Sequence, residues 1–222
     1  HIEKHKGIIA NPNWSTTQMV VALKPIHDTV KIKRVVVSTY QAVSGTGVDA
    51  VEELKQQLKM ILSGKAPKHE VYPYPIAFNV LPHIDIFDET GYSLEELKMV
   101  NETRKIFDDD SMAITATTVR VPVVNCHSES VNIETKEKLT ADMAREILSK
   151  APGIKVVDEP QRKQYPLPGD ASGRDEVFIG RIREDFSLKN GLNLWIVADN
   201  LRKGAALNAV QIAENMSDNA LI

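Results

Sequence analysis

The sequence predicts a mixed α/β domain of the α+β type, built on a mixed, largely antiparallel sheet with helices packed on one face. Segments with helical periodicity alternate with strand-like segments along the 222 residues. Hydrophobic residues form 42% of the chain, an ordinary globular content. A chain of this length buries enough surface to fold without a disulfide or a metal. No linker-like segment divides it, so we expect residues 1–222 to form one domain.

The first forty residues are expected to form a helix and a strand. Ser15 or Thr16 can cap a helix over residues 18–23, which Pro25 is expected to kink or end. Residues 32–40 contain three consecutive valines, which favour a buried strand.

The middle of the chain is expected to hold two helices, a long loop and two strands. Residues 48–62 keep their apolar side chains on one helical face. Residues 66–86 are rich in proline and aromatic residues, which indicates a long packed loop. Ser93 begins a helix that ends near residue 108, and residues 112–124 and 128–135 have the alternation of strands.

The last third is expected to contain two helices, two strands and a surface loop. Thr140 caps a helix that runs to Lys150. A loop over residues 161–174 leads to strands at 175–183 and 192–198, joined by a turn around Asn190-Gly191. An alanine-rich helix over residues 201–216 completes the pattern.

Charge and composition exclude several classes of protein. The net charge is −3, and acids and bases are interspersed, so we expect no nucleic-acid surface. No apolar run reaches the roughly 18–20 residues of a membrane span, and the first six residues are too polar for the core of a signal peptide. Cys126 is the single cysteine, which fits a reducing compartment. We therefore expect a cytoplasmic protein.

The segment Asn11-Pro12-Asn13-Trp14-Ser15-Thr16 is the sharpest local feature. A turn that delivers one side chain to a helix N-terminus suits a nucleophile, because the unpaired N–H groups there stabilise negative charge. Trp14 cannot serve as one, since an indole does not attack carbonyl carbons. Taken alone, the segment indicates a packing residue beside a capped helix.

Cys126 and His127 are neighbours between two predicted strands, and in extended backbone neighbours point to opposite faces, so the two do not readily form a thiolate–imidazolium pair. Cys126 is interpreted as a buried small hydrophobe and His127, taken alone, as a structural histidine. Arg120 lies seven residues before His127, an odd spacing. A bulge or bend is therefore needed to bring Arg120 and His127 to one pocket.

The remaining local signals are weaker. Glu95 and Lys98 are neighbours at i, i+3 on a helix and fit a solvated surface pair. Gly45-Thr46-Gly47 fits an anion cradle or, more simply, a strand-to-helix turn. The histidines are scattered, and no His/Cys spacing fits a metal site.

Taken in order, six blocks of the chain resemble aspartate-semialdehyde dehydrogenase over essentially its whole length. The blocks are Asn11–Thr16, Ser38–Gly45, Glu95–Lys98, Arg120–Pro122, His127–Ser130 and Asp199–Ala206. The resemblance implies the fold of the C-terminal domain of semialdehyde and glyceraldehyde-phosphate dehydrogenases. It also implies the NADPH-dependent reduction of aspartyl-β-phosphate to aspartate semialdehyde, on the route to lysine, threonine and methionine.

The resemblance assigns catalytic roles to three positions. Trp14 stands where the family has the cysteine that forms a thioester with the substrate. Gln41 matches the residue that orients the thioacyl group, and His127 matches the acid/base histidine.

Binding roles follow in the same way. Arg120 matches the arginine that binds the substrate carboxylate, while Glu95 and Lys98 match contacts to the substrate amine and phosphate. Asn13 is expected to border the phosphate site, and Asn200 matches the segment that touches the cofactor.

The chain departs from the family pattern at two points, which leave its activity open. Trp14 replaces the nucleophile, and we expect its bulky ring to fill the acyl pocket beside Gln41 and His127. No Gly-x-Gly-x-x-Gly motif occurs, so the N-terminal dinucleotide-binding domain is expected to be absent, and NADP, the family cofactor, is not expected to bind. We expect a homodimer without turnover. The alternatives are a non-catalytic dimerisation module and a sister reductase acting on N-acetylglutamyl phosphate.

Overall fold

A six-stranded mixed sheet forms the centre of the computed structural model, which describes residues 5–219. The strand order is β2-β1-β3-β6-β5-β4. The three central pairings are antiparallel, and the two outer ones, β1 with β2 and β5 with β4, are parallel. The expected mixed, largely antiparallel sheet is therefore confirmed. The strands are β1(Ile32–Gln41), β2(Ala113–Arg120), β3(His127–Thr135), β4(Ile154–Val156), β5(Val177–Asp185) and β6(Gly191–Ala198).

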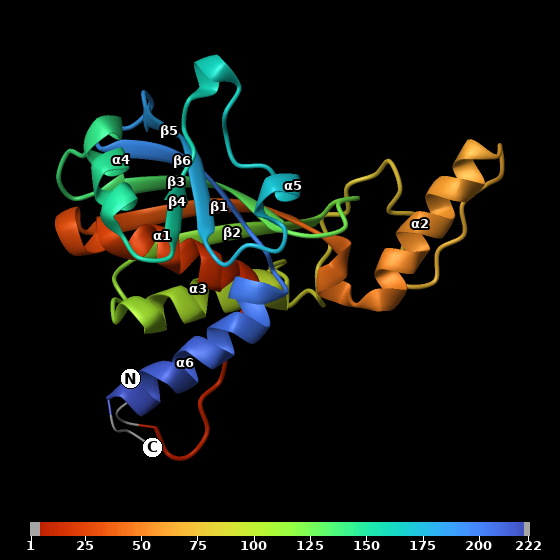
Figure 1. Cartoon of the computed structure of the whole chain (residues 1–222), viewed down its shortest axis with the longest axis horizontal. Helices are drawn as coiled ribbons and strands as arrows, with labels where there is room; N and C mark the ends of the chain where they lie inside the picture. The colour runs from red at the N-terminus through yellow and green to blue at the C-terminus, as the bar shows by residue number, and fades with distance from the viewer. Residues whose placement is uncertain (1–4, 220–222) are drawn as a thin grey trace.

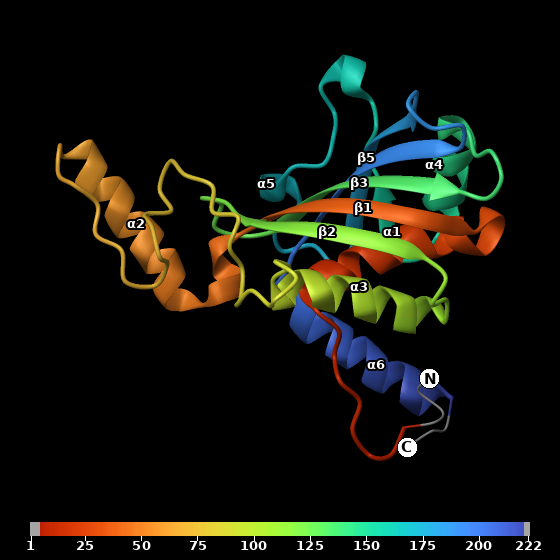
Figure 2. The same ribbon diagram turned by 180° about the vertical axis from the view of Figure 1, so that it is seen from behind.

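Three helices pack on one face of this sheet, as expected: α1(Trp14–Val30), α3(Leu94–Phe107) and α4(Ala141–Lys150). Figure 2 shows the opposite face, where β1, β2 and β3 lie nearer to the viewer than α1. The main core fills the space between α1 and the sheet. Met19, Leu23 and Ile26 of α1 are fully buried there against Ile133 and Leu192 of the strands.

Helix α1 differs from its prediction at both ends. Its N-cap is Asn13, whose side-chain Oδ1 accepts the backbone N–H of Thr16 at 3.1 Å. The helix continues through Pro25 to Val30, so Pro25 neither ends it nor shortens it to residue 23. Burial of the apolar face of α1 against the sheet outweighs the helix hydrogen bond that the proline removes.

The region between residues 151 and 174 holds more regular structure than the loop signals indicated. The short strand β4(Ile154–Val156), a 3-10 turn η3(Pro160–Arg162) and the one-turn helix α5(Pro168–Ala171) lie there. Strand β2 ends at Arg120 instead of residue 124, because the chain turns away from β1 at this point. The last helix also differs, since a π-helical turn η4(Arg202–Ala206) precedes α6(Leu207–Asp218).

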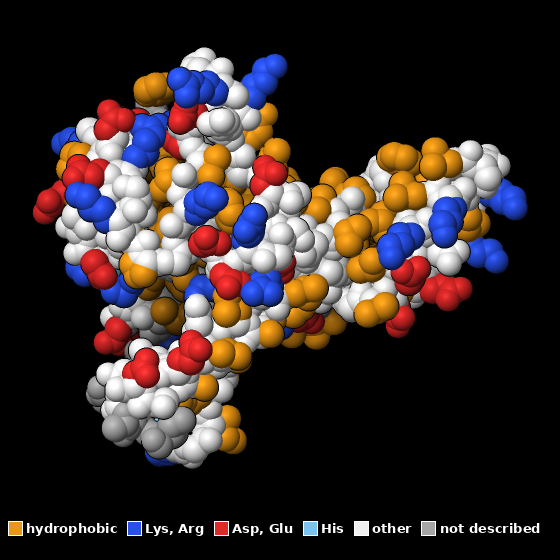
Figure 3. All heavy atoms as spheres, in the orientation of Figure 1, with side chains coloured by type: hydrophobic (Ala, Val, Ile, Leu, Met, Phe, Trp, Pro, Cys, Tyr) orange, Lys and Arg blue, Asp and Glu red, His pale blue; other side chains and the backbone are white. Residues whose placement is uncertain are grey.

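An arm projects from the end of the sheet, as Figures 1 and 2 both show. It consists of α2(Val48–Leu62), which was predicted to the residue, and the following long loop, and it has its own small core around Leu54, Tyr72 and Ile76. Figure 3 shows hydrophobic side chains gathered on the surface of this arm. Tyr74 is 65% exposed and Phe78 is 73% exposed.

No helix within residues 5–219 combines the length and apolarity needed to cross a membrane. The polar segment considered for a signal peptide falls largely on residues 1–4, which lie outside the described residues.

Candidate functional site

A pocket of about 670 Å³ opens where the ends of two strands and two helices converge. The parallel strands β1 and β2 end there at Gln41 and Arg120, and helices α1 and α3 begin there. The lining includes most of the residues predicted for the site: Asn13, Trp14, Gln41, Glu95, Lys98 and Arg120. Residues from the beginning, the middle and the second half of the chain thus line a single cavity.

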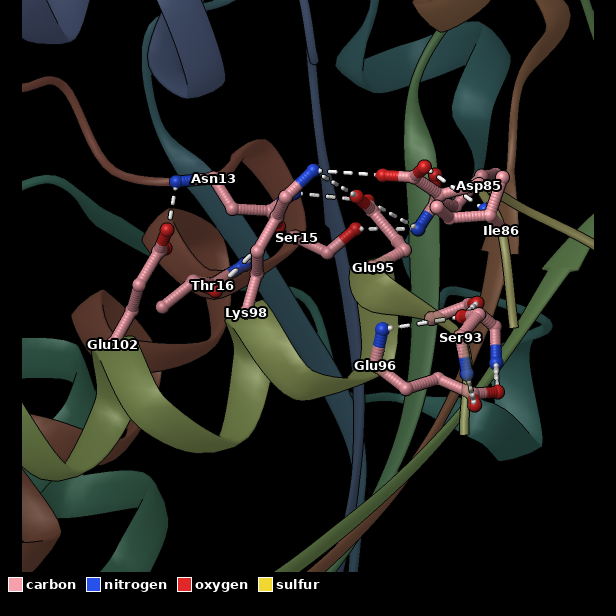
Figure 4. A network of polar contacts seen from close by, with 12 residues as sticks. Asn13, Ser15, Thr16, Asp85, Ile86, Ser93, Glu95, Glu96, Lys98 and Glu102 are labelled. Atoms are coloured by element: carbon pink, nitrogen blue, oxygen red, sulfur yellow. Dashed lines mark hydrogen bonds and ion pairs between the residues drawn. The ribbon is translucent and has the colours of Figure 1, made fainter. Parts of the chain in front are cut away.

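Asn13 ties the start of α1 to α3, as Figure 4 shows. Its side-chain Nδ2 donates to Glu95 Oε1 at 2.9 Å, and its backbone N–H donates to Glu102 Oε2 at 2.7 Å. The Oδ1 of Asn13 also caps α1, so the same side chain both fixes the start of the helix and lines the pocket.

Gln41 completes this network from the end of β1. It is 2% exposed, and its Nε2 donates to Ser15 Oγ at 3.0 Å and to Glu95 Oε1 at 3.2 Å. Both donors of the amide nitrogen are therefore used, which leaves the carbonyl oxygen as the group available to a ligand. The Glu95 carboxylate receives bonds from Asn13 and Gln41 and lies 3.9 Å from Lys98 Nζ.

Lys98 makes the expected ion pair with Glu95 at 3.9 Å, but its shorter contact is to Asp85. Its Nζ lies 2.9 Å from Asp85 Oδ2, a contact visible in Figure 4. The hydrogen bond to Asp85 raises the pKa of Lys98, and burial opposes this rise. Lys98 therefore remains charged at the pocket mouth.

Arg120 and His127 meet through the backbone of Ala42. The Ala42 N–H donates to His127 Nδ1 at 3.0 Å, and the Ala42 carbonyl accepts from Arg120 Nη1 at 2.7 Å. The two residues lie on different strands, β2 and β3, which flank β1. Of the two expected devices, a bulge or a bend, the structure has the bend: the chain bends at residues 121–126 and passes from β2 to β3.

His127 is held in one neutral form. A backbone N–H can only donate, so Nδ1 must carry a lone pair and the ring proton sits on Nε2. Burial, with the nearby charge of Arg120, lowers the pKa of His127 well below its ordinary value. The Nε2 atom is buried and finds no hydrogen-bond partner among the residues that the structure describes. His127 thus presents an uncommitted donor.

Trp14 occupies the first position of α1 and forms one wall of the pocket. Its ring centre lies 6.0 Å from that of His127. Two glycines make room for it: a Cβ added at Gly45 would lie 2.9 Å from the indole Cζ3, and one at Gly204 would lie 2.9 Å from Trp14 Cβ. The indole therefore lies beside His127 as expected, but it lines the cavity and does not fill it.

Of the other sequence candidates, Asn200 and Cys126 do not line the pocket, whereas Gly45 and Thr46 do. The Asn200 side chain is 1% exposed and is used within the chain, since its Oδ1 accepts the Cys126 N–H and its Nδ2 donates to Ser44 Oγ. Cys126 is fully buried, and burial raises the pKa of its thiol to about 12. Gly47 caps α2 at φ 115°, so Gly45-Thr46-Gly47 is a strand-to-helix turn.

Three contributors were missed from the sequence: Asp85, Glu102 and the backbone of Ala42. Asp85 lies in the segment predicted as a loop, and Glu102 sits two helical turns after Glu95, where it reads as a surface acid. The spacing of Glu95, Lys98 and Glu102 on one helical face was the available signal. No sequence signal marks the two bonds of Ala42, because they come from the main chain.

The chain is similar to proteins of one kind. The sequence matches the family described as semialdehyde dehydrogenase, dimerisation domain, over residues 23–203. The aspartate-semialdehyde dehydrogenase of Aquifex aeolicus is 59% identical over 220 residues, covering 99% of this chain and 65% of that protein. That of Legionella pneumophila is 60% identical over 210 residues, covering 94% of this chain and 60% of that protein.

Solved structures agree. Aspartate semialdehyde dehydrogenase II of Vibrio cholerae, complexed with ASA, superimposes with a TM-score of 0.92 at 48% identity, covering 95% of this chain and 62% of that one. This chain thus spans less than two thirds of the length of these relatives. On the family match and this shared fold, the chain belongs to the semialdehyde dehydrogenase dimerisation-domain family.

Proposed function

We propose that this chain is the substrate-binding and dimerisation part of an aspartate-semialdehyde dehydrogenase. The reaction is the NADPH-dependent reduction of aspartyl-β-phosphate to aspartate semialdehyde. The observation that carries the proposal is the convergence of Asn13, Gln41, Glu95, Lys98 and Arg120 on one pocket, with His127 bonded behind it. The names of the Aquifex aeolicus and Legionella pneumophila relatives support it.

The charges of the pocket suit an amino acid with a phosphorylated side chain. Arg120 commits Nη1 to Ala42 and has further donors in its planar fork for the substrate α-carboxylate. Glu95 is a buried carboxylate that can accept from an α-ammonium group. Lys98 supplies the positive charge for the phosphoryl oxygens. Three charged groups of the ligand thereby meet three fixed side chains.

His127 and Gln41 would act at the reacting carbonyl. The Nε2–H of His127 is a donor for an oxygen that gains negative charge, and burial strengthens such a bond. The Gln41 amide, anchored by Ser15 and Glu95, would hold the acyl group against rotation.

Trp14 stands at the position that the resemblance assigns to the nucleophilic cysteine. An indole offers neither a thiolate nor another group that forms a thioester, and its bulk narrows the space in front of His127. We therefore infer that the chain with Trp14 binds ligand but does not turn over.

The described residues do not by themselves fit the dinucleotide cofactor. The side chain of Asn200, the position matched to the cofactor contact, already makes hydrogen bonds to Ser44 and Cys126. A structural neighbour from Candida albicans was solved with NADP and shares 24% identity, so it bears on the fold. NADP would supply the hydride, and we derive no step through it.

We infer a homodimer built on the sheet face that the helices leave uncovered. The family description as a dimerisation domain supports this. Tyr40 of β1 and Trp195 of β6 pack together on that face with ring centres 5.4 Å apart, and Tyr40 remains 38% exposed. Aromatic residues of this kind are enriched at protein interfaces. A cytoplasmic location fits this assignment and stays a proposal.

The test is a rescue. The dinucleotide-binding domain of a related enzyme is fused ahead of the chain in three forms, with Trp14, Trp14→Ala and Trp14→Cys. Each is assayed for phosphate-dependent NADP reduction with aspartate semialdehyde. We expect turnover in the cysteine form alone, by at least about 10³-fold over the others. A cysteine form no faster than the alanine form contradicts the proposed function.

A further inference from the structure

The segment that carries Asp85 is fixed at both ends over the pocket. At one end, Leu81 and Arg120 exchange two backbone hydrogen bonds of 2.9 and 2.8 Å. At the other, the Leu94 N–H donates to the Ile86 carbonyl at 2.9 Å, next to the start of α3. Asp85 is thus presented by a segment anchored to the same two elements that supply Arg120 and Lys98.

The backbone of Asp85 adopts a conformation that L-residues rarely take. Its φ is 68°, in the left-handed region. Its Oδ1 accepts the N–H of Ile86 at 2.9 Å, which leaves Oδ2 directed at Lys98 Nζ.

The charges of the pocket give Asp85 a distinct position. The lining holds three acids, Asp85, Glu95 and Glu102, against two cations, Lys98 and Arg120. Glu95 and Glu102 both accept hydrogen bonds from Asn13, so they also maintain the start of α1. Asp85 makes its side-chain contacts to Lys98 and to its own neighbour Ile86. An anion that binds Lys98 therefore competes with the Asp85 carboxylate for the same ammonium group and meets its negative charge.

We propose that Asp85 is a positioning and specificity residue, which holds Lys98 over the pocket and competes with the phosphoryl group of the ligand for it. This inference rests on the proposed function, in which Lys98 contacts phosphate. The carboxylate stays close to Lys98, and it repels a doubly charged phosphoryl group more strongly than a singly charged anion.

The experiment uses the 222-residue chain with Trp14 intact and inorganic phosphate as the probe. Binding is followed by the NMR signal of the Trp14 indole N–H, identified by its loss in Trp14→Phe. Asp85→Asn removes the competing charge and keeps the shape. Glu89→Gln is the matched control, since Glu89 is an exposed acid of the same segment that does not line the pocket.

We expect Asp85→Asn to bind phosphate with a Kd about 3–10-fold lower than the unmodified chain, and Glu89→Gln to stay within about twofold. The preference for phosphate over nitrate should rise in Asp85→Asn, because the doubly charged anion loses the larger repulsion. The pKa of the Lys98 ammonium, followed by carbon NMR, should also fall in this variant and not in the control.

Equal phosphate affinity in Asp85→Asn and Glu89→Gln overturns the inference. The same holds if Lys98 titrates identically in both or if no variant binds phosphate. The two proposals fail separately: an affinity change without turnover in the Trp14→Cys fusion sinks the proposed function alone. Turnover in that fusion with unchanged phosphate affinity sinks the role of Asp85 alone.

Discussion

Glu129 of β3 makes the stability of this domain dependent on pH in an unusual direction. The residue is fully buried on the face of the sheet that meets α1. Neither of its carboxyl oxygens makes a hydrogen bond of good geometry within residues 5–219. Thr39, directly opposite on β1, is also fully buried, and its hydroxyl finds no partner among those residues. A carboxylate here would be an uncompensated buried charge.

Burial raises the pKa of Glu129 well above its ordinary value, and the nearby Gln18 amide only partly offsets this. The unfolded chain ionises near pH 4.3. Above that pH the native state therefore holds one proton more than the unfolded state. The free energy of unfolding then falls by about 1.4 kcal/mol per pH unit until the native carboxyl ionises. The stabilisation is complete below the unfolded pKa and is lost as the pH rises through the folded pKa.

The substitution Glu129→Gln keeps the shape and removes the ionisation. We expect the variant to gain about 1–3 kcal/mol near pH 7, a range reduced from the full linkage effect because the amide also lacks partners. The advantage should shrink towards pH 5. Urea unfolding at several pH values measures it, and taking the difference from the parent chain cancels the other titrating groups.

Glu134→Gln is the matched control, since Glu134 lies on the same strand but pairs with Lys33 at 2.6 Å near the surface. We expect this variant to lose at most about 1 kcal/mol, with no gain at high pH. If the Glu129→Gln curve runs parallel to that of the parent chain, Glu129 is ionised in the native state. The argument from its burial is then wrong.

Three further predictions concern packing, the thiol and a helix cap. Gly204→Ala places a Cβ 3.2 Å from the Trp14 Cα, so we expect the free energy of unfolding in urea to fall by about 1–3 kcal/mol. The control is Gly169→Ala, where an added Cβ meets nothing within 4 Å and the loss should be under about 1 kcal/mol. Equal losses in the two variants would count against the contact with Trp14. Burial raises the pKa of the Cys126 thiol to about 12, so the folded chain should resist a thiol reagent. In urea the thiol should react at least about 100-fold faster. Similar rates in the two conditions would refute the burial of Cys126. Ser93→Ala removes the side-chain bond of the α3 capping box and keeps the backbone bond to Glu96, so it should cost about 1 kcal/mol in thermal unfolding, while Ser93→Thr should retain most of the stability. An alanine variant as stable as the threonine variant would show that the cap contributes little.

The elements that could be predicted are those whose signals lie within a few residues. The apolar spacing of residues 48–62 defines α2, and the Ser93 cap sets the start of α3. The short strand β4 escaped notice because three residues carry too little periodicity. Asn13, rather than Ser15 or Thr16, caps α1, a choice that depends on its bonds to α3.

The residues of the site were named through the family resemblance, but their arrangement depends on the sheet order. Arg120 and His127 are adjacent only because β1 lies between β2 and β3. The positive φ of Cys126, at 72°, turns the chain into β3 without a glycine to signal it. Asp85 could not be singled out, since its pairing with Lys98 crosses thirteen residues and depends on the fixed path of the loop.

The two hydrogen bonds of Ala42 come from its main chain and do not depend on which side chain this residue carries. Nineteen of the twenty amino acids offer the same N–H to His127, so the path of the main chain decides which ring nitrogen carries the proton. Proline is the exception. Ala42 has φ −65° and ψ 150°, values that a proline ring already favours. Proline at this position would remove the donor, but its ring carbon would point where the N–H now points, at His127 Nδ1 only 3.0 Å from the nitrogen, so it would push the imidazole out of its place.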